Sequence, residues 1–371
     1  MIMGSTLIPP GWQGNLTPGH ARTAILICIL LKGAGLSAQL FTEDQTLRYD
    51  TSYIQVYRDE LTTRVYLSGK QNGYLLSERL FSPWITYRTN SHYQLGLGYT
   101  YSFLTLNVGF KLPVFNSDDD LYGESRGLDL QSHTIFRNMI VDLYLQWNRG
   151  YYLSHPDDPG SLPGPDPGFP VRGDLRTSVV GINIQRLFNS ERYSYKASFV
   201  QNEFQKRSAG SPMLGIEGYW MLGMADSLII PASLTGSDFA GGMTFNQADL
   251  FQVGINAGYA YTLVIRERFY LSLATTWGLT AGNCILNNTA SSELQSSGIS
   301  LGVDNHNRAS MGFNKNNFYI GVSWIQFNMS QNYGYKKGWF RYSTNNIRLN
   351  VVRRFRLHRP LKILRPDLWI F

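Results

Sequence analysis

Apolar and polar side chains alternate with a period of two along most of the chain from Leu61 onward. In the clearest segment, Phe251 to Ile265, every second residue is apolar or aromatic and the residues between are mostly small or polar. The segment from Phe269 to Leu279 repeats this pattern after the turn 266–268. A period of two is that of a β-strand, and about ten residues are what a tilted strand needs to cross a membrane. The pattern therefore predicts hairpins of membrane-spanning strands.

Similar alternation marks strands in both halves of the chain. It recurs at residues 94–101, 104–110, 139–148, 180–188 and 347–355. The turn Asn189-Ser190-Glu191 is expected to lead into another strand over 193–203. These patterns predict about 12 to 14 strands, and an outer-membrane barrel is expected to have an even number. The parity fails between Ser211 and Leu250, where one further strand would restore it.

Long polar connections separate the predicted hairpins, whereas the turns within the hairpins are short. The long connections are residues 112–127, 150–173, 224–248, 281–297 and 329–340. Short turns on one side and long loops on the other are typical of outer-membrane barrels. We therefore predict an all-β fold, a transmembrane antiparallel β-barrel. A soluble β-sandwich or lipocalin-like barrel is the alternative, but its exterior should carry more charge than the Gly, Ser, Thr, Asn and Gln found opposite the apolar face.

The first residues have the plan of a secretory signal. An apolar core at 24–31 follows Arg22, and small residues end at Ala38, after which we expect cleavage. A short buried helix is the alternative, because the core is shorter than the roughly 20 apolar residues of a spanning helix. We expect a signal peptide with an upstream extension at 1–38 and a periplasmic segment at 39–60. The barrel would follow at 61–355, with a basic tail at 356–371.

Composition agrees with a membrane barrel and argues against a nucleic-acid-binding protein. Charged residues are 16% of the chain and aromatic residues 14%, and Tyr and Trp suit a membrane–water boundary. The net charge of +7 is concentrated in the leader and the C-terminal tail, so the body is close to neutral and carries no basic stripe. The tail arginines are expected either to contact anionic lipid or a periplasmic partner, or to have no partner.

Few residues suggest chemistry. Cys28 lies in the leader, so Cys284 would be a lone thiol, with no disulfide and no cysteine metal site. Ser132 and His133 are adjacent, and neighbouring side chains of a strand point to opposite faces. The histidines at 92 and 155 fall in predicted turns. We therefore predict no catalytic residue, no metal and no cofactor.

Two charged groups of the sequence are candidate sites. The acidic run 118–120 begins like a calcium loop, but Leu121 and Gly127 stand where Gly and Glu are required. We interpret this run as a solvated loop. The group Glu203, Lys206 and Arg207 is a possible lumen charge cluster that tunes ion selectivity, and an ordinary polar strand end is the alternative.

Several stretches resemble a known family. They are YDTSYIQVYRDELTTRVYLSGK at 49–70, LDLQSH at 128–133, FVQNEFQKRSAGS at 199–211 and NAGYAYTLVIRERFYLS at 256–272. They are similar to Bacteroidota outer-membrane barrels known as domain of unknown function 4421. The resemblance extends from about Tyr49 to Phe355 and implies an exported barrel, without an activity, a ligand or a catalytic residue.

These observations predict a non-enzymatic outer-membrane β-barrel, either a porin-like small-solute pore or an envelope scaffold. One alternative is a barrel enzyme acting on lipid or peptide, which needs a Ser/His/Asx or Asp/His group at the extracellular rim. Another is a soluble periplasmic β-protein. The expected partners are outer-membrane lipid, lipopolysaccharide and the barrel-assembly machinery during insertion. No nucleic-acid partner is expected, and the sequence indicates no oligomeric state.

Overall fold

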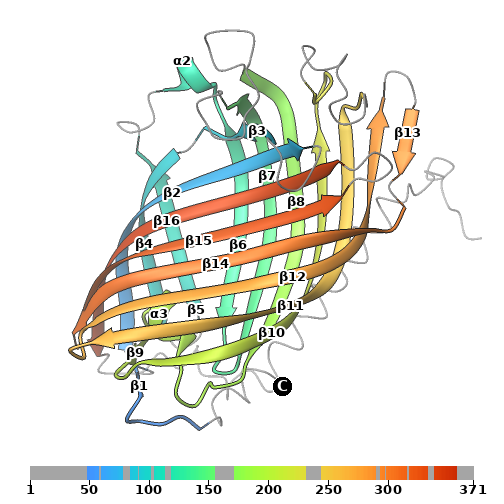
Figure 1. Cartoon of the computed structure of the whole chain (residues 1–371). Helices are drawn as coiled ribbons and strands as arrows, with labels where there is room; N and C mark the ends of the chain where they lie inside the picture. The colour runs from blue at the N-terminus through green and yellow to red at the C-terminus, as the bar shows by residue number, and fades with distance from the viewer. Residues whose placement is uncertain are drawn as a thin grey trace, which may run out of the picture. The chain divides into compact units, whose positions relative to one another are not determined.

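The computed structural model is almost entirely β-structure (Figure 1). It describes residues 48–57, 60–77, 84–90, 92–101, 104–112, 118–154, 171–230, 244–289, 293–296, 298–315, 317–332 and 338–356. The predicted signal peptide, the proline-rich part of 150–173 and the tail beyond Arg356 lie outside these residues.

Fourteen strands belong to one antiparallel sheet. They are β2 (Glu60–Ser77), β3 (Trp84–Arg88), β4 (His92–Tyr101), β5 (Leu104–Lys111), β6 (Arg126–Ile135), β7 (Met139–Leu153), β8 (Val171–Leu187), β10 (Ala209–Met224), β11 (Gln247–Ile265), β12 (Phe269–Asn288), β13 (Glu293–Ser296), β14 (Ser300–Lys315), β15 (Phe318–Asn332) and β16 (Trp339–Arg356). The remaining described elements are β1 (Ile54–Val56), β9 (Glu203–Gln205), α2 (Asp119–Tyr122) and α3 (Tyr195–Phe199). Neither described helix is long and apolar enough to cross a membrane.

The sheet closes on itself because its first and last strands pair. β16 pairs with β2 along its whole length, from Trp339 opposite Ser77 to Arg356 opposite Glu60. The closed ring has ten strands: β2, β3, β7, β8, β10, β11, β12, β14, β15 and β16. The predicted transmembrane antiparallel barrel is therefore confirmed.

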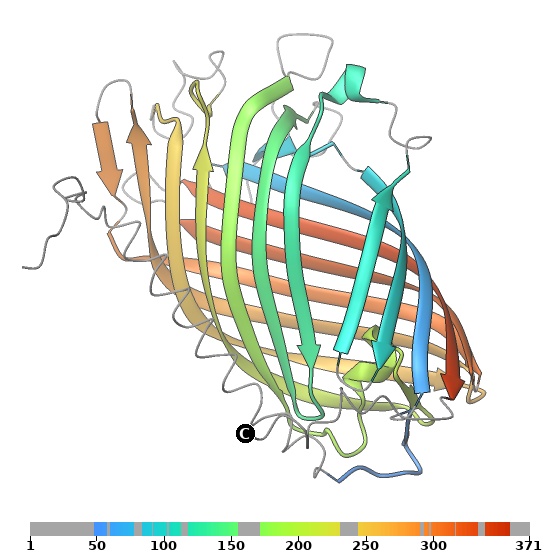
Figure 2. The same cartoon turned by 180° about the vertical axis from the view of Figure 1, so that it is seen from behind.

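Among the described strands, the barrel wall is discontinuous between β5 and β6. The short strand β3 links β2 to β7 at the long-loop end. Nearer the short turns, β2 pairs with β4, β4 with β5, and β7 with β6. Among the described residues, β5 and β6 form no ladder with each other. We call these two facing, unpaired strand edges the seam; Figure 2 shows the strands from this side.

The outer wall is apolar, as the alternation predicted. On β11 and β12 the side chains of Ile255, Leu273 and Trp277 are exposed, while the intervening Asn256, Ser272 and Thr276 are buried in the interior. The same arrangement holds on β16, where Leu349 is exposed and Asn350 is buried. An apolar surface backed by a polar interior is the arrangement of a barrel whose wall contacts lipid.

Some predicted boundaries were wrong. Residues 193–203 form no wall strand, because Ser194 caps α3 by accepting a hydrogen bond from the Ala197 N–H. The strand missing from the sequence count is β10, which pairs with β8 and β11. The predicted loop at 281–297 begins too early, since β12 continues to Asn288. Its polar end continues the ladder with β11, which shields its backbone despite the asparagines.

Candidate functional site in the barrel interior

The middle of the interior contains a buried ion pair with a histidine beside it. Arg308 on β14 donates to Asp142 on β7 at 2.5 Å, and both side chains are almost fully buried. His133 on β6 contacts the other carboxylate oxygen of Asp142 through Nδ1 at 2.7 Å. A carboxylate only accepts hydrogen bonds, so Nδ1 carries the proton. Both oxygens of Asp142 are thus satisfied, as a buried charge requires.

A second buried group lies on β10 and β14. Glu217 accepts from His306 Nε2 at 2.9 Å and from Asn256 Nδ2 at 3.0 Å. Nearby, Asp304 accepts from Gln252 Nε2 at 2.6 Å and from the Ser330 N–H at 3.0 Å. Asp304 has no cationic partner in the part of the chain that the structure describes. These contacts hold polar side chains of β10, β11 and β14 in fixed positions, with one backbone N–H of β15.

Aromatic rings from separate parts of the wall meet across the interior. The Tyr144 and Phe327 rings stack with centroids 4.9 Å apart, and Tyr219 lies 4.8 Å from Phe327. Their strands, β7, β15 and β10, lie apart in the ring. We call these three residues the aromatic barrier. Towards the long loops it continues into a buried apolar core that includes Tyr74, Tyr87, Leu175, Phe245, Met329 and Phe340.

The short-turn end is closed by an inward-folded connection. Residues 189–208, between β8 and β10, contain α3 and β9, and β9 pairs with β1. We call residues 189–208 together with β1 the mouth plug. Arg64 of β2 donates to the Val200 carbonyl at 2.7 Å, and Arg354 of β16 donates to the Gln201 carbonyl at 2.7 Å. The plug is therefore tied to the barrel wall by guanidinium groups.

Burial also affects titration in the plug. Burial raises the pKa of the Tyr195 phenol to about 12, although the nearby Arg308 charge acts in the opposite direction. The Arg308 guanidinium lies over this ring, with Cζ 5.6 Å from the centroid. Tyr195 thus covers the central ion pair from below.

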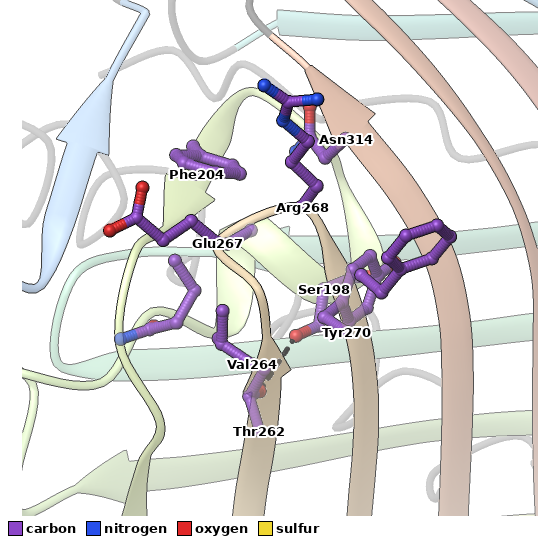
Figure 3. Close-up of a pocket in the computed structure, with 11 residues that line it drawn as sticks. Ser198, Phe204, Thr262, Val264, Glu267, Arg268, Tyr270 and Asn314 are labelled. Carbon is purple, nitrogen blue, oxygen red and sulfur yellow. Dashed lines mark hydrogen bonds between the residues drawn. The ribbon is translucent and has the colours of Figure 1, made fainter.

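A small pocket lies where the plug meets the turn between β11 and β12 (Figure 3). Ser198, Glu267, Arg268, Tyr270 and Asn314 contribute to its lining. The Tyr270 hydroxyl donates to the Ser198 carbonyl at 3.2 Å, so this pocket is a gap in the packing between plug and wall rather than a passage.

The three residues predicted as a lumen charge cluster each contact a different partner. Glu203 is buried in the plug, where it accepts from Arg137 at 2.6 Å and from the Ser194 hydroxyl at 2.5 Å. Lys206 donates to the Thr51 carbonyl at 2.9 Å. Arg207 lies over the Tyr53 ring at 5.7 Å. Glu203 therefore has Arg137 as its partner, and the role in ion selectivity stays a prediction.

The other sequence candidates form no site among the described residues. Asp118 and Asp119 accept hydrogen bonds from the Asn90 amide, and no group of His, Cys, Asp and Glu side chains there is arranged to hold a metal ion. Cys284 is buried in the apolar core and forms no disulfide with another described residue.

Sequence reasoning missed the importance of Asp142, Glu217, Asp304 and Arg308. The sequence contained one signal for them: each is a charged residue in a strand, on the face opposite the apolar one. Such a residue faces the barrel interior and not lipid. His133 was considered only with Ser132, whereas its partner is Asp142. Both His–carboxylate pairs lie inside the barrel, not at a rim, and both carboxylates are fully buried.

Comparison with known proteins gives a family match. The family described as "Domain of unknown function (DUF4421)" matches residues 48–355. No curated protein matches the sequence.

Several solved structures are distantly similar to the chain. The outer membrane protease OmpT from Escherichia coli is 9% identical, with a TM-score of 0.32, and the match covers 81% of this chain and 98% of that one. OmpT, an outer membrane protein of Vibrio cholerae, is 8% identical with a TM-score of 0.25, covering 82% and 100% of the two chains. The CymD monoaromatic hydrocarbon channel is 11% identical with a TM-score of 0.27, covering 86% and 92%. The barrel assignment rests on the strand pairing of this chain itself.

Proposed function

The chain belongs to the DUF4421 family, and we propose that it is an exported outer-membrane barrel that remains closed to solutes and acts as a scaffold in the cell envelope. The observation that carries this proposal is the aromatic barrier, whose three rings meet from strands on separate parts of the ring. A small-solute pore needs a continuous polar path. The barrier and the apolar core above it interrupt such a path.

The mouth plug supports the same proposal. Its contacts with Arg64, Arg354 and Arg137 fix it to the wall by charge-assisted hydrogen bonds, which are stronger than neutral ones. A solute would therefore meet two obstacles in series, the plug and the aromatic barrier.

Two measurements test this proposal. Cell fractionation followed by electrophoresis with and without boiling is expected to place the protein in the outer membrane and to show a heat-dependent shift, since closed barrels stay folded in detergent. In planar bilayers the purified protein is expected to give no stable conductance. Steady conductance of the unmodified protein would overturn the scaffold proposal and favour the pore. The double variant Tyr144→Ala/Phe327→Ala removes two rings of the aromatic barrier and leaves the mouth plug unchanged. Its conductance in planar bilayers therefore tests the barrier alone.

A further inference from the structure

The seam is the place where the interior is accessible through the wall. On most strands the residues facing the interior are buried, as Asn256 and Ser272 are. On β5 and β6, by contrast, the consecutive residues 107–110 and 126–130 are all exposed, so both faces are accessible. The cross-strand register places Asn107, opposite Gly98, and Asp129, opposite the buried Gln146, on the interior face.

Within the described part of the chain, two interior arginines near the seam have no carboxylate partner. Arg64 on β2 is 5% exposed, and its Nε is buried without a hydrogen-bond acceptor. Arg348 on β16 also has a buried Nε without an acceptor, and its guanidinium lies over the Tyr66 ring at 4.4 Å. Neither arginine forms a salt bridge in the described part of the chain, and the two positive charges repel each other. Two unneutralised guanidiniums inside a membrane barrel form an electrostatic site for an anion.

Small residues bring this site close to the seam. The Arg64 side chain packs over Gly98, where an added Cβ would lie 2.5 Å from its Cγ. Tyr66 packs over Gly96 in the same way, and its hydroxyl would lie 3.1 Å from a Cβ at Gly109 on β5. The Tyr66 ring, against which the Arg348 guanidinium lies, therefore extends across β4 as far as β5, the strand whose edge forms one side of the seam.

The side chains on the outer face of the seam are apolar and suit an alkyl chain. On the inner face, one ion pair joins the two sides of the seam. Val108 and Phe110 on β5, and Leu128 and Leu130 on β6, are exposed on the outer face. Inside, Lys70 of β2 forms an ion pair with Asp129 of β6 and so connects the two sides of the seam by a side-chain contact. This contact is partly exposed, so its energetic contribution is small compared with that of a backbone ladder.

We propose that the seam admits a single-chain amphiphile from the membrane and that its anionic head, a carboxylate or phosphate, binds Arg64 and Arg348 inside the barrel. The apolar tail stays at the seam among the exposed side chains of β5 and β6. Carboxylate and phosphate both present negatively charged oxygens, in a planar and a tetrahedral group respectively. Guanidinium groups bind either one through paired N–H donors. The site is independent of the closed aromatic barrier, since entry is through the wall and not along the barrel axis.

The test measures binding of dodecanoate and dodecyl phosphate to the full-length protein in neutral detergent by titration calorimetry. We expect saturable binding of both, with at least tenfold weaker binding by Arg348→Gln and by Arg64→Gln. Arg353→Gln, on the exposed outer face of β16, is the matched control and should bind as the unmodified protein does. Acetate and inorganic phosphate test the head group alone, and dodecanol tests the tail alone.

The outcomes separate the proposal from its alternatives. Tight binding of acetate or inorganic phosphate without a contribution from the tail would overturn entry of an amphiphile, as would equal binding of dodecanol. If both interior variants bind the amphiphiles with unchanged affinity, Arg64 and Arg348 do not bind the head group, and the proposal is wrong. If Arg64→Gln fails to fold because its contact with the plug is lost, Arg348→Gln decides, since Arg348 lies over the Tyr66 ring and is not one of the arginines that hold the plug. Conductance is a separate readout, so failure here leaves the scaffold proposal standing.

Discussion

Arg308 and Arg348 are both arginines on interior faces of neighbouring parts of the same barrel, yet their surroundings differ. Arg308 donates to Asp142, which also binds His133, and Tyr195 covers the group. Arg348 has the Tyr66 ring as its neighbour and no carboxylate partner among the described residues. A buried charge that is paired with an opposite charge contributes to the structure, whereas an unneutralised charge costs free energy that a ligand can recover. The difference distinguishes residues that hold the barrel together from residues suited to binding.

The largest expected effect comes from breaking the partnered arginine. Arg308→Met leaves Asp142 without its cation, and removing one partner of a buried pair costs about 3–5 kcal/mol. Arg348→Met should lower the free energy of unfolding by less than about 1 kcal/mol, or raise it, because no partner is left behind. Guanidinium unfolding of the detergent-folded protein, followed by tryptophan fluorescence, measures both. Equal losses would show that the distinction between the two arginines is wrong.

A second prediction compares the wall at the seam with the wall opposite. β11 and β12 pair continuously from Gln247–Asn287 to Ile265–Phe269, while β5 and β6 each lack a ladder on one edge. We expect the unpaired amides of β5 and β6 to exchange hydrogen about 100-fold faster than amides of β11. Hydrogen exchange by mass spectrometry, resolved by peptide, measures this. Equal protection on both sides of the barrel would mean that the seam is sealed in the membrane.

The ion pair across the seam should have a smaller effect. Lys70→Met removes the contact with Asp129, which should increase exchange in β6 and lower the free energy of unfolding by about 0–1 kcal/mol. Arg126→Met is the matched control, because Arg126 pairs with Glu124 two residues away on the same side of the seam. Increased exchange in the control as well would assign the effect to loss of charge in general.

The smallest expected effect is a pH dependence of the plug. The pKa of Tyr195 is raised to about 12, above the roughly 10 of an exposed phenol. Its contribution to stability is therefore fully present below pH 10 and is lost as the pH rises through 12. Ultraviolet titration of the phenolate should show one late-titrating group that is absent in Tyr195→Phe. Tyr193 is also buried with a raised pKa. The titration of Tyr195 is therefore read from the difference between the spectra of the unmodified protein and of Tyr195→Phe.

The outer wall could be predicted from the sequence, but the interior could not. The side chains of Ile255 and Leu273 face lipid wherever their strands are placed in the ring, so local alternation is sufficient. The plug was mistaken for a strand because Tyr193, Tyr195, Ala197 and Phe199 also alternate with polar residues. The partnership of Asp142 and Arg308 spans 166 residues and depends on which strands lie opposite each other in the closed ring. No local pattern contains that information.

The position of the plug has a consequence for how the barrel forms. Val200 and Gln201 are adjacent in the middle of the chain, yet they accept hydrogen bonds from Arg64 of β2 and Arg354 of β16. These are the first and last long strands, whose pairing closes the ring and joins residues at opposite ends of the chain. Contacts of such long sequence separation form slowly. The plug can act as a template that aligns both strands, so its deletion should slow refolding more than it lowers the stability of the finished barrel.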